Sequence, residues 1–478
     1  MPKRKRPLWW AALKIIFLAL LVLLAGLAPY PHALVAAMRQ AEAHRATSAY
    51  GAALEAYRRA ARLAPDWPLP WLRTGQVLLV QHRFPEATDA YRQAGRLGAG
   101  LEAVLGLGDS FAGQGDWAQA LSTWYRALAL APRDPRIHLA LARGHLAQGR
   151  FQQAEASARQ ALSLASEPGR HAAVETQAHA LLGRLLAGRE DAAALDHLRR
   201  AGEADLRAAI EVAAAEPEPA RQALLLGAAF LQRDELPLAR HHFERAAAPE
   251  SAGSQQARAE ALAYLAHTLD RLGETVQARE RLEQALALDA ESAPAYYFLG
   301  IHERRVGNLQ GARDALWQAL QWDPDNAALR AEMARAYEEE PDYALAEEWY
   351  QGAVDAAPDD AGFRLLLAQF YVNHLYRIEE AGVPAAEAAV IAVPSEPRAY
   401  DLLGWAYALA GRTAEAEAQL ARALDRDPGL VSAHFHLGSL YLRTGRPDLA
   451  RQHLQRAADL DTGGILRARA EALLLRLD

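Results

Sequence analysis

Residues 402–428 read LLGWAYALAGRTAEAEAQLARALDRDP, and this stretch contains a pattern that recurs along most of the chain. A small residue, Gly404, follows a leucine, a tyrosine stands three positions later, and a second small residue, Ala416, stands twelve positions later. Aligning the chain on the first small residue gives twelve copies with a period close to 34 residues, which is typical of a repeat array. The aligned residues are Ala41, Gly75, Gly108, Ala142, Gly183, Gly227, Ala266, Gly300, Ala334, Ala368, Gly404 and Gly438.

Each recurring position has a packing or turning role. The first small residue lets one helix approach the next, and the aromatic or leucine three places later fills the space beside it. Gly411 supplies the left-handed or open backbone that ends a helix, and Thr413 is a residue type that caps the next one. Pro428 stands where the second helix can no longer continue. Each copy is therefore predicted to be a helix, a turn and a second helix.

The composition agrees with an all-α fold. Alanine and leucine dominate, strand-forming residues are sparse, and apolar residues make up 51% against 23% charged ones. The chain has no cysteine, which excludes disulfides, thiolate metal sites and cysteine nucleophiles.

The pattern resembles the tetratricopeptide repeat (TPR) family, whose signature has W/L-x-x-L-G-x-x-Y in the first helix and A-x-x-x-Y/F-x-x-A-x-x-x-x-P in the second. The resemblance extends from Leu34 to about Gly464. It implies a right-handed superhelical solenoid of stacked helix-turn-helix units, whose first helices line a concave groove that commonly holds a peptide or an extended protein segment. In residues 402–428 the matching positions are Leu403, Gly404, Tyr407, Ala416, Leu420, Ala423 and Pro428.

The repeat is irregular in two places. Around Gly183 the spacing stretches to 41, 44 and 39 residues, and AIEVAAAEPEP, residues 209–219, is interpreted as an acidic, proline-punctuated connector where the array bends or divides. The tenth copy has two extra residues, and its second helix is expected to start near Pro384. ILRARAEALLLRLD, residues 465–478, is predicted to be a terminal capping helix.

The N-terminal segment is predicted to anchor the chain in a membrane. MPKRKRP precedes LWWAALKIIFLALLVLLAGLA, residues 8–28, in which Lys14 is the only charge, and such a helix spans about 30 Å. The positive-inside bias places the N-terminus in the cytoplasm and the repeats outside it. A cleaved signal peptide ending at Gly26-Leu27-Ala28, followed by secretion, is the alternative, but Pro29 disfavours cleavage there.

We therefore expect six segments in this chain. They are a basic cytoplasmic N-terminus (1–7), a transmembrane signal-anchor helix (8–28), repeats 1 to 4 (34–168), an irregular repeat with its connector (169–219), repeats 6 to 12 (220–464) and the capping helix (465–478).

The charge distribution argues against nucleic acid as a partner. The net charge is −7, and five of the positive charges lie in the first fourteen residues, so the remainder carries −12. Phosphate-backbone binding needs a basic face, which such a body does not predict.

Catalytic and metal-binding motifs are missing from the sequence. His241-His242 and His434-x-His436 have the wrong spacing for a zinc pair on a helix and are interpreted as surface or packing residues. The carboxylates of 338–340, 347–348 and 402–428 are interpreted as a solvated outer face. There is no phosphate loop of the P-loop type and no GxSxG elbow, so we expect no enzyme, no metal and no cofactor.

The resemblance also implies which residues face the groove, because the family projects fixed positions of the first helix into it. Trp405 is such a position, and within residues 402–428 it is the one residue without a packing role in the pattern. Aromatic rings with arginines suit an extended peptide, since arginine binds carboxylates. The implied residues are Tyr264, His267, Arg271, Tyr297, Phe298, Ile301, Arg304, Arg305, Arg335, Gln369, Asn373, Leu402, Trp405, Phe435, His436 and Arg443.

The leading hypothesis is a membrane-anchored scaffold that binds protein or peptide partners in its groove. One alternative is an accessory factor of cell-envelope or polysaccharide biosynthesis that docks an enzyme or a glycan. The other is an enzyme with a cryptic site in the irregular region 169–219.

Overall fold

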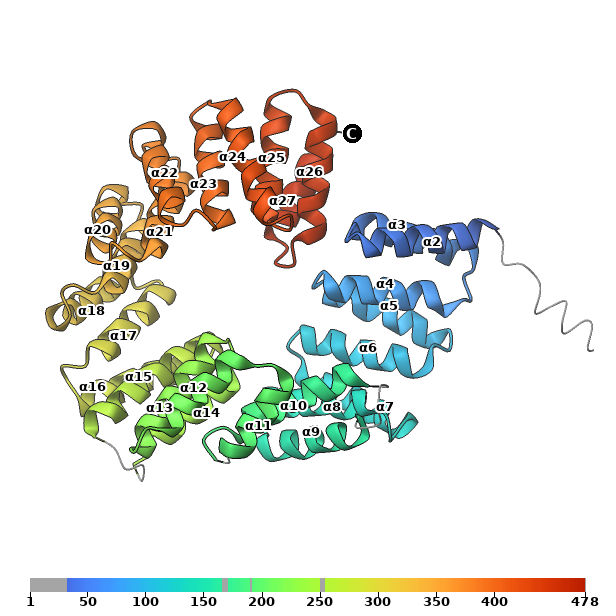
Figure 1. The fold of residues 1–478 in the computed structure, drawn as a ribbon, viewed down its shortest axis with the longest axis horizontal. Helices are drawn as coiled ribbons and strands as arrows, with labels where there is room; N and C mark the ends of the chain where they lie inside the picture. Colours follow the sequence, from blue (N-terminus) through green and yellow to red (C-terminus); the bar gives the residue numbers. More distant parts are fainter. Residues whose placement is uncertain (1–31, 166–170, 190, 250–253, 478) are drawn as a thin grey trace, which may run out of the picture. The chain divides into compact units, whose positions relative to one another are not determined.

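The computed structural model describes residues 32–165, 171–189, 191–249 and 254–477, and every regular element in these ranges is a helix (Figure 1). The predicted membrane anchor, residues 8–28, lies outside these ranges. Within them, no helix has the length and apolar character needed to span a membrane.

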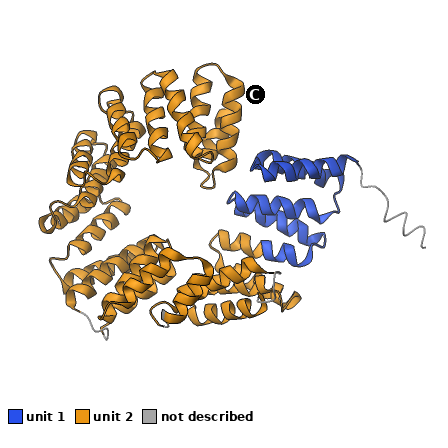
Figure 2. Cartoon of the chain, in the orientation of Figure 1, with its two compact units in different colours: residues 1–106 blue, residues 107–478 orange. Residues whose placement is uncertain are grey.

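The chain forms two compact units, residues 1–106 and 107–478, and the boundary falls inside one helix (Figure 2). The first unit contains two helical hairpins and the start of the next helix. Its helices are α2 (His32–Ala46), α3 (Tyr50–Leu63), α4 (Pro68–Val80), α5 (Phe84–Arg96) and the first part of α6 (Gly100–Gly113).

The second unit contains the rest of the array, including the irregular region 169–219. Its helices are α7 (Trp117–Leu130), α8 (Pro135–Ala147), α9 (Phe151–Ala165), α10 (Ala172–Leu186), α11 (Asp191–Ala201), α12 (Ala204–Ala214), α13 (Pro219–Gln232), α14 (Leu236–Ala247), α15 (Gln255–Arg271), α16 (Thr275–Leu288), α17 (Ala293–Arg305), α18 (Leu309–Trp322), α19 (Ala327–Glu339), α20 (Tyr343–Ala356), α21 (Ala361–His374), the π-helix η1 (Ile378–Gly382), α22 (Val383–Ala392), α23 (Pro397–Leu409), α24 (Thr413–Arg426), α25 (Val431–Arg443), α26 (Pro447–Leu460) and α27 (Ile465–Leu474).

The predicted helix pairs are confirmed. Consecutive helices pack against each other within a copy, as in α15 with α16, α17 with α18 and α25 with α26. The first helices of neighbouring copies also touch, so that α21, α23, α25 and α27 form one continuous layer. That layer places side chains from several copies on a common face.

The small residue of the pattern is a point of close approach between the two helices of a copy. A Cβ atom on Gly404 would lie 2.6 Å from Leu420 Cγ, closer than Cβ atoms pack, and 3.0 Å from the Leu420 backbone nitrogen, which is also tight. Leu420 and Ala416 are fully buried beneath it. The same contact recurs sixteen residues apart at Gly438 with Leu454 and at Gly300 with Leu316.

The turn between the helices follows the predicted chemistry. Gly411 has φ of +78°, which L-residues with a Cβ rarely adopt. The next N–H, that of Arg412, then donates to the Tyr407 carbonyl at 2.8 Å, which satisfies a carbonyl at the end of α23.

Carboxylates of the second helices join neighbouring copies. Tyr441 Oη donates to Glu417 at 2.8 Å, and Arg446 also binds Glu417 at 2.8 Å while its guanidinium lies 4.4 Å from the Tyr441 ring centroid. Burial, followed by the hydrogen bond to Glu417, raises the pKa of Tyr441 to about 12, so the hydroxyl remains a donor. Tyr371 and Arg377 bind Glu347 in the same way.

The interpretation of these acidic runs as a solvated face is therefore wrong at several positions. Besides Glu347 and Glu417, Glu338 accepts hydrogen bonds from Tyr350 at 2.5 Å and from His374 at 2.7 Å. Glu339 and Glu340 are exposed, as interpreted, but they also form ion pairs with Arg304 and Arg313. The periodicity could not show this, because each partner comes from another helix.

The fifth copy is the main irregularity. Its second helix, α11, is followed by an additional helix, α12, so residues 209–214 of the expected connector are helical. Phe151 of α9 and His241 of α14 pack with ring centroids 4.5 Å apart, although they are 90 positions apart in sequence. In the tenth copy η1 absorbs the extra residues, and α22 begins at Val383, next to the predicted Pro384.

Adding a methyl group at the close approach should destabilise the array. Gly404→Ala forces its Cβ against Leu420, and such overpacking costs about 1–3 kcal/mol of unfolding free energy. Gly352→Ala in α20 is the matched control, since its Cβ would meet only the mobile end of Arg330, at 3.1 Å, and should be neutral or stabilising. Thermal unfolding followed by circular dichroism compares them, and an unchanged Tm for Gly404→Ala would contradict this packing role.

Candidate functional site

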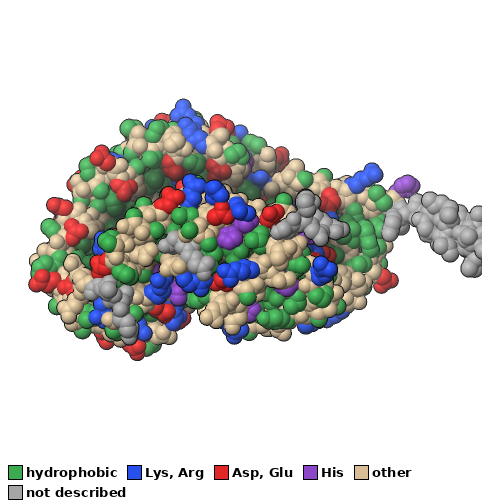
Figure 3. Space-filling view, turned by 60° about the horizontal axis from the view of Figure 1, so that its bottom comes forward, with side chains coloured by type: hydrophobic (Ala, Val, Ile, Leu, Met, Phe, Trp, Pro, Cys, Tyr) green, Lys and Arg blue, Asp and Glu red, His purple; other side chains and the backbone are tan. Residues whose placement is uncertain are grey.

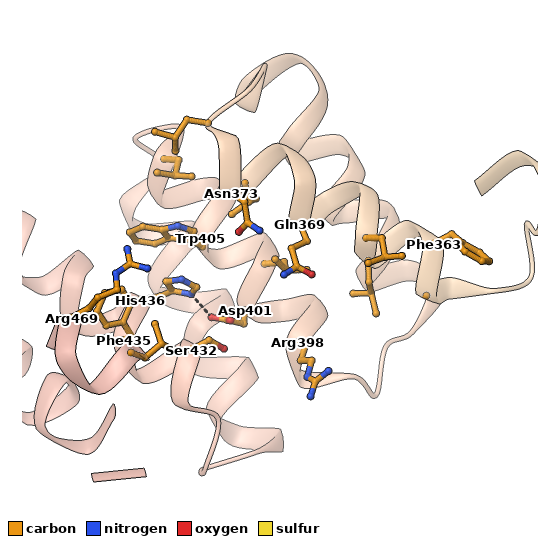
Figure 4. A pocket seen from close by; sticks show the side chains of 18 of the residues that line it. Phe363, Gln369, Asn373, Arg398, Asp401, Trp405, Ser432, Phe435, His436 and Arg469 are labelled. Carbon is orange, nitrogen blue, oxygen red and sulfur yellow. Dashed lines mark hydrogen bonds and ion pairs between the residues drawn. The ribbon is translucent and has the colours of Figure 1, made fainter. Parts of the chain in front are cut away.

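The first helices of the last three copies and the terminal helix line an open pocket of about 970 Å³ (Figure 4). We call it the first-helix pocket. It is lined by Asp360, Gly362, Phe363, Leu365, Leu366, Gln369, Val372, Asn373, Leu375, Arg398, Asp401, Leu402, Trp405, Leu409, Ser432, Phe435, His436, Leu466 and Arg469. Six residues that the TPR resemblance assigned to the groove are among them: Gln369, Asn373, Leu402, Trp405, Phe435 and His436.

Trp405 is held by a neighbouring copy. Its ring is stacked on His436 of α25, with centroids 4.5 Å apart and planes 9° apart. His436 Nδ1–H in turn donates to the carboxylate of Asp401, one helical turn before Trp405, at 2.7 Å. Asp401 is 4% exposed, so this contact fixes the ring and leaves Nε2 for other partners. Trp405 therefore has a packing contact that the repeat pattern does not contain, and the residue also lines the pocket.

Phe435 and the terminal helix form the adjoining wall. Phe435 is buried, and the Arg469 guanidinium of α27 lies 5.1 Å from its ring centroid, within the range of a cation–π contact. Figure 4 shows Trp405, His436, Phe435 and Arg469 gathered on one side. The capping helix thus contributes to the pocket as well as covering the end of the array.

Gln369 and Asn373 of α21 add amide groups to the lining (Figure 4). Both side chains are exposed, and neither forms a hydrogen bond with any residue that the structure describes. Each amide offers a donor and an acceptor, which is the pairing that a peptide backbone needs.

A second group of the implied residues packs together on α15 and α17. The Phe298 ring lies 4.9 Å from Tyr264, 4.8 Å from His267 and 5.1 Å from Tyr297, measured between centroids, and Ile301 is half-buried nearby. Burial, with the nearby charge of Arg271, lowers the pKa of His267 to about 4, so it is neutral near pH 7. These rings form a packed aromatic cluster and do not line the first-helix pocket.

The implied arginines are mostly occupied by carboxylates of this chain. Arg304 pairs with Glu332 at 3.3 Å and with Glu339, Arg335 also pairs with Glu332, and Arg271 pairs with Asp234 at 2.6 Å. Arg305 and Arg443 are exposed and form no ion pair with described residues. A ligand carboxylate would therefore have to displace an internal partner at Arg271, Arg304 and Arg335.

The histidine pairs point to different surroundings, as the spacing predicted. His434 contacts His453 and the Pro428 carbonyl, whereas His436 contacts Asp401. His242 is buried against Phe230, and His241 packs on Phe151. Among the described residues no three His, Asp or Glu side chains are grouped so as to hold a metal ion.

Sequence reasoning missed several lining residues. Arg398 and Asp401 occupy positions that the family projects into its groove but were left out of the implied set. Phe363 does not occupy such a position, and Arg469 belongs to a helix assigned only to capping. The signal available for Asp401 was its place on the first helix, one turn before the groove-facing Trp405.

Two family profiles, both described as tetratricopeptide repeat, match this chain. One matches residues 72–135, 265–327, 380–431 and 410–465, and the other matches residues 111–185 and 304–370. Together they cover more than half of the sequence, so the chain belongs to the tetratricopeptide repeat family of scaffolds for protein–protein interactions, which are typically non-catalytic. No curated protein matches it.

Solved structures with a similar fold include yeast Tom70, at 15% identity over 93% of this chain and 96% of that one, with a TM-score of 0.40. YrrB, described as a TPR protein with an unusual peptide-binding site, is 21% identical over 40% of this chain and 97% of its own, with a TM-score of 0.31. A thermophilic TPR protein of Thermus thermophilus is 24% identical over 38% of this chain and 99% of its own, with a TM-score of 0.33.

Proposed function

We propose that this protein is a non-enzymatic, membrane-anchored scaffold that binds an extended peptide segment of a partner protein in the first-helix pocket. The observation that supports the proposal most strongly is the pocket itself, because three consecutive first helices and α27 contribute to one cavity of about 970 Å³. Such a volume accommodates several residues of a peptide.

The chemistry of the lining suits an extended backbone with an apolar side chain. Trp405, Leu402 and Leu409 offer apolar surface, while Gln369 and Asn373 offer amide groups in the same pocket. The stack of Trp405 on His436, held by Asp401, restricts the indole before a ligand arrives. A pre-ordered ring loses little conformational freedom on binding, and aromatic anchors of this kind commonly carry much of the binding energy.

The anchor and its orientation are proposed from sequence. Residues 8–28 are apolar apart from Lys14 and follow a basic segment, which favours a cytoplasmic N-terminus and repeats outside the cytoplasm. The superhelical course of the array and a narrower role in cell-envelope or polysaccharide biosynthesis stay predictions. The role in cell-envelope or polysaccharide biosynthesis would be supported if a single enzyme partner co-purified with this protein in a fixed ratio.

Single-cysteine labelling tests the orientation, because the natural chain has no cysteine. Ser395→Cys lies at an exposed turn between α22 and α23, so it should react with a membrane-impermeant maleimide in cells whose cytoplasmic membrane is intact. Reaction only after that membrane is opened would show that the orientation is wrong. The mass of the labelled chain distinguishes an uncleaved anchor from one cleaved after Ala28.

Peptides selected from a random phage-displayed library against the full chain should depend on Trp405. Trp405→Ala should weaken the Kd of a selected peptide by about tenfold or more, the usual effect of truncating an aromatic anchor. Trp322→Ala is the matched control, because Trp322 is 50% exposed at the end of α18 and does not line the pocket. Isothermal titration calorimetry measures both.

A double variant, Gln369→Ala with Asn373→Ala, tests the same pocket without disturbing the fold, because both side chains are exposed. It should also weaken the Kd, by removing amide hydrogen bonds. A library that yields no binder, or binders indifferent to both variants, would contradict the proposed site.

A further inference from the structure

The irregular fifth copy creates a second pocket, away from the first-helix pocket. In it, the start of α9 and the middle of α14 meet beside the end of α10, as the contact between Phe151 and His241 shows. We call this cavity of about 550 Å³ the basic pocket. It is lined by Gly149, Arg150, Phe151, Gln152, Gln153, Leu185, Ala187, Arg189, Leu238, His241, His242 and Arg245.

The lining of the basic pocket contains three arginines and two histidines but no carboxylate among the described residues. The other pockets described for this chain contain acidic residues as well as arginines. The first-helix pocket, for example, contains Asp360 and Asp401. A wall of this composition is unexpected in a chain with a net charge of −7. It therefore needs a local explanation.

Internal ion pairs offset only part of this positive charge. Arg189 pairs with Glu155, but Glu155 also pairs with Arg159. Arg245 donates to the Gly188 carbonyl at 3.2 Å, and its Nη1 lies 3.5 Å from His242 Nδ1. Glu244, the next acid on α14, is held by Arg240 at 2.8 Å. Arg150 forms no ion pair with any described residue.

The surroundings of the pocket reinforce its preference for an anion. Arg150 immediately precedes α9, a helix of 15 residues, and an arginine side chain has no acceptor with which to cap the helix N–H groups. Burial, followed by the charges of His241 and Arg245, lowers the pKa of His242 to about 3. Burial and Arg245 also lower the pKa of His241. Each neutral imidazole still has one N–H to donate.

We propose that the basic pocket binds a phosphate monoester group, with Arg150, Arg189 and Arg245 as its cationic ligands. Guanidinium groups bind phosphate oxygens through paired, charge-assisted hydrogen bonds, and the start of α9 adds backbone donors. The cavity is larger than a phosphate, which leaves room for the organic group that carries it. In Figure 3, blue basic and purple histidine side chains lie on the face that comes forward, with red acidic side chains among them.

This inference is independent of the peptide-binding proposal, because the two pockets share no residue. It also gives the irregular region a role in binding. The lining contains no carboxylate, serine or threonine that could act as a nucleophile or an acid–base pair with the histidines, so the residues described favour binding over catalysis.

Isothermal titration calorimetry of the full chain in neutral detergent, in buffer without phosphate, tests the site. The probes are inorganic phosphate, glycerol 3-phosphate and dihexanoyl phosphatidic acid. Arg150→Gln and Arg189→Gln should each weaken the Kd for glycerol 3-phosphate by about tenfold, the loss of one charge-assisted contact. Arg126→Gln is the matched control, an exposed arginine of α7 with no partner among the described residues, and it should leave the Kd unchanged.

The three probes separate the possible sources of the phosphate. Equal affinity for glycerol 3-phosphate and dihexanoyl phosphatidic acid supports a soluble organic phosphate, and tighter binding of the lipid analogue supports a headgroup. Either result supports the proposal only if Arg150→Gln weakens the Kd. The circular dichroism spectrum of Arg150→Gln should match that of the natural chain, which shows that the variant is folded. Absence of binding at millimolar probe, or an equal loss with Arg126→Gln, would overturn the proposal.

Discussion

The close approach of the two helices at the small residue of each copy is the constraint on which the rest of the structure depends. At Gly404 no atom can be added without meeting Leu420, and at Gly438 the same holds for Leu454. Helices packed this closely present a narrow, repeated unit, so successive first helices touch and their outward faces become one surface. The first-helix pocket exists because three such faces are adjacent and α27 covers the end.

Contacts between copies convert this geometry into a specific site. Tyr441 and Arg446 bind Glu417 of the preceding copy, and His436 binds Asp401 of the preceding copy. These hydrogen bonds fix one copy relative to the next, and the second of them also orients the ring on which Trp405 stacks. Stability of the array and preorganisation of the site therefore depend on the same kind of interaction.

The sequence predicts the parts of the molecule that local spacing determines. Helix pairs, the turn at Gly411 and the start of α22 follow from residue type and period, and the resemblance places Trp405, His436 and Gln369 on the first helices. Spacing does not say whether a polar side chain meets a ligand or another part of the chain. Arg304 is engaged by Glu332 and Glu339 for this reason, and Arg469 enters the pocket from outside the repeat. The basic pocket was equally hidden, since Phe151 and His241 come from helices of non-adjacent copies, and the period does not predict that they meet.

The two pockets thus offer different chemistry. The last three copies give an aromatic and amide-lined pocket, and the irregular fifth copy gives an arginine-lined one. The central claim is that the first-helix pocket is where a partner segment lies. Photo-crosslinking in cells measures this most directly, with a photoreactive amino acid in place of Trp405 and, in a separate strain, in place of Trp322. The account predicts discrete adducts from position 405 that map to a short segment of a partner protein, and none of these from position 322. Identical adduct patterns at the two positions, or adducts at 322 alone, would contradict it.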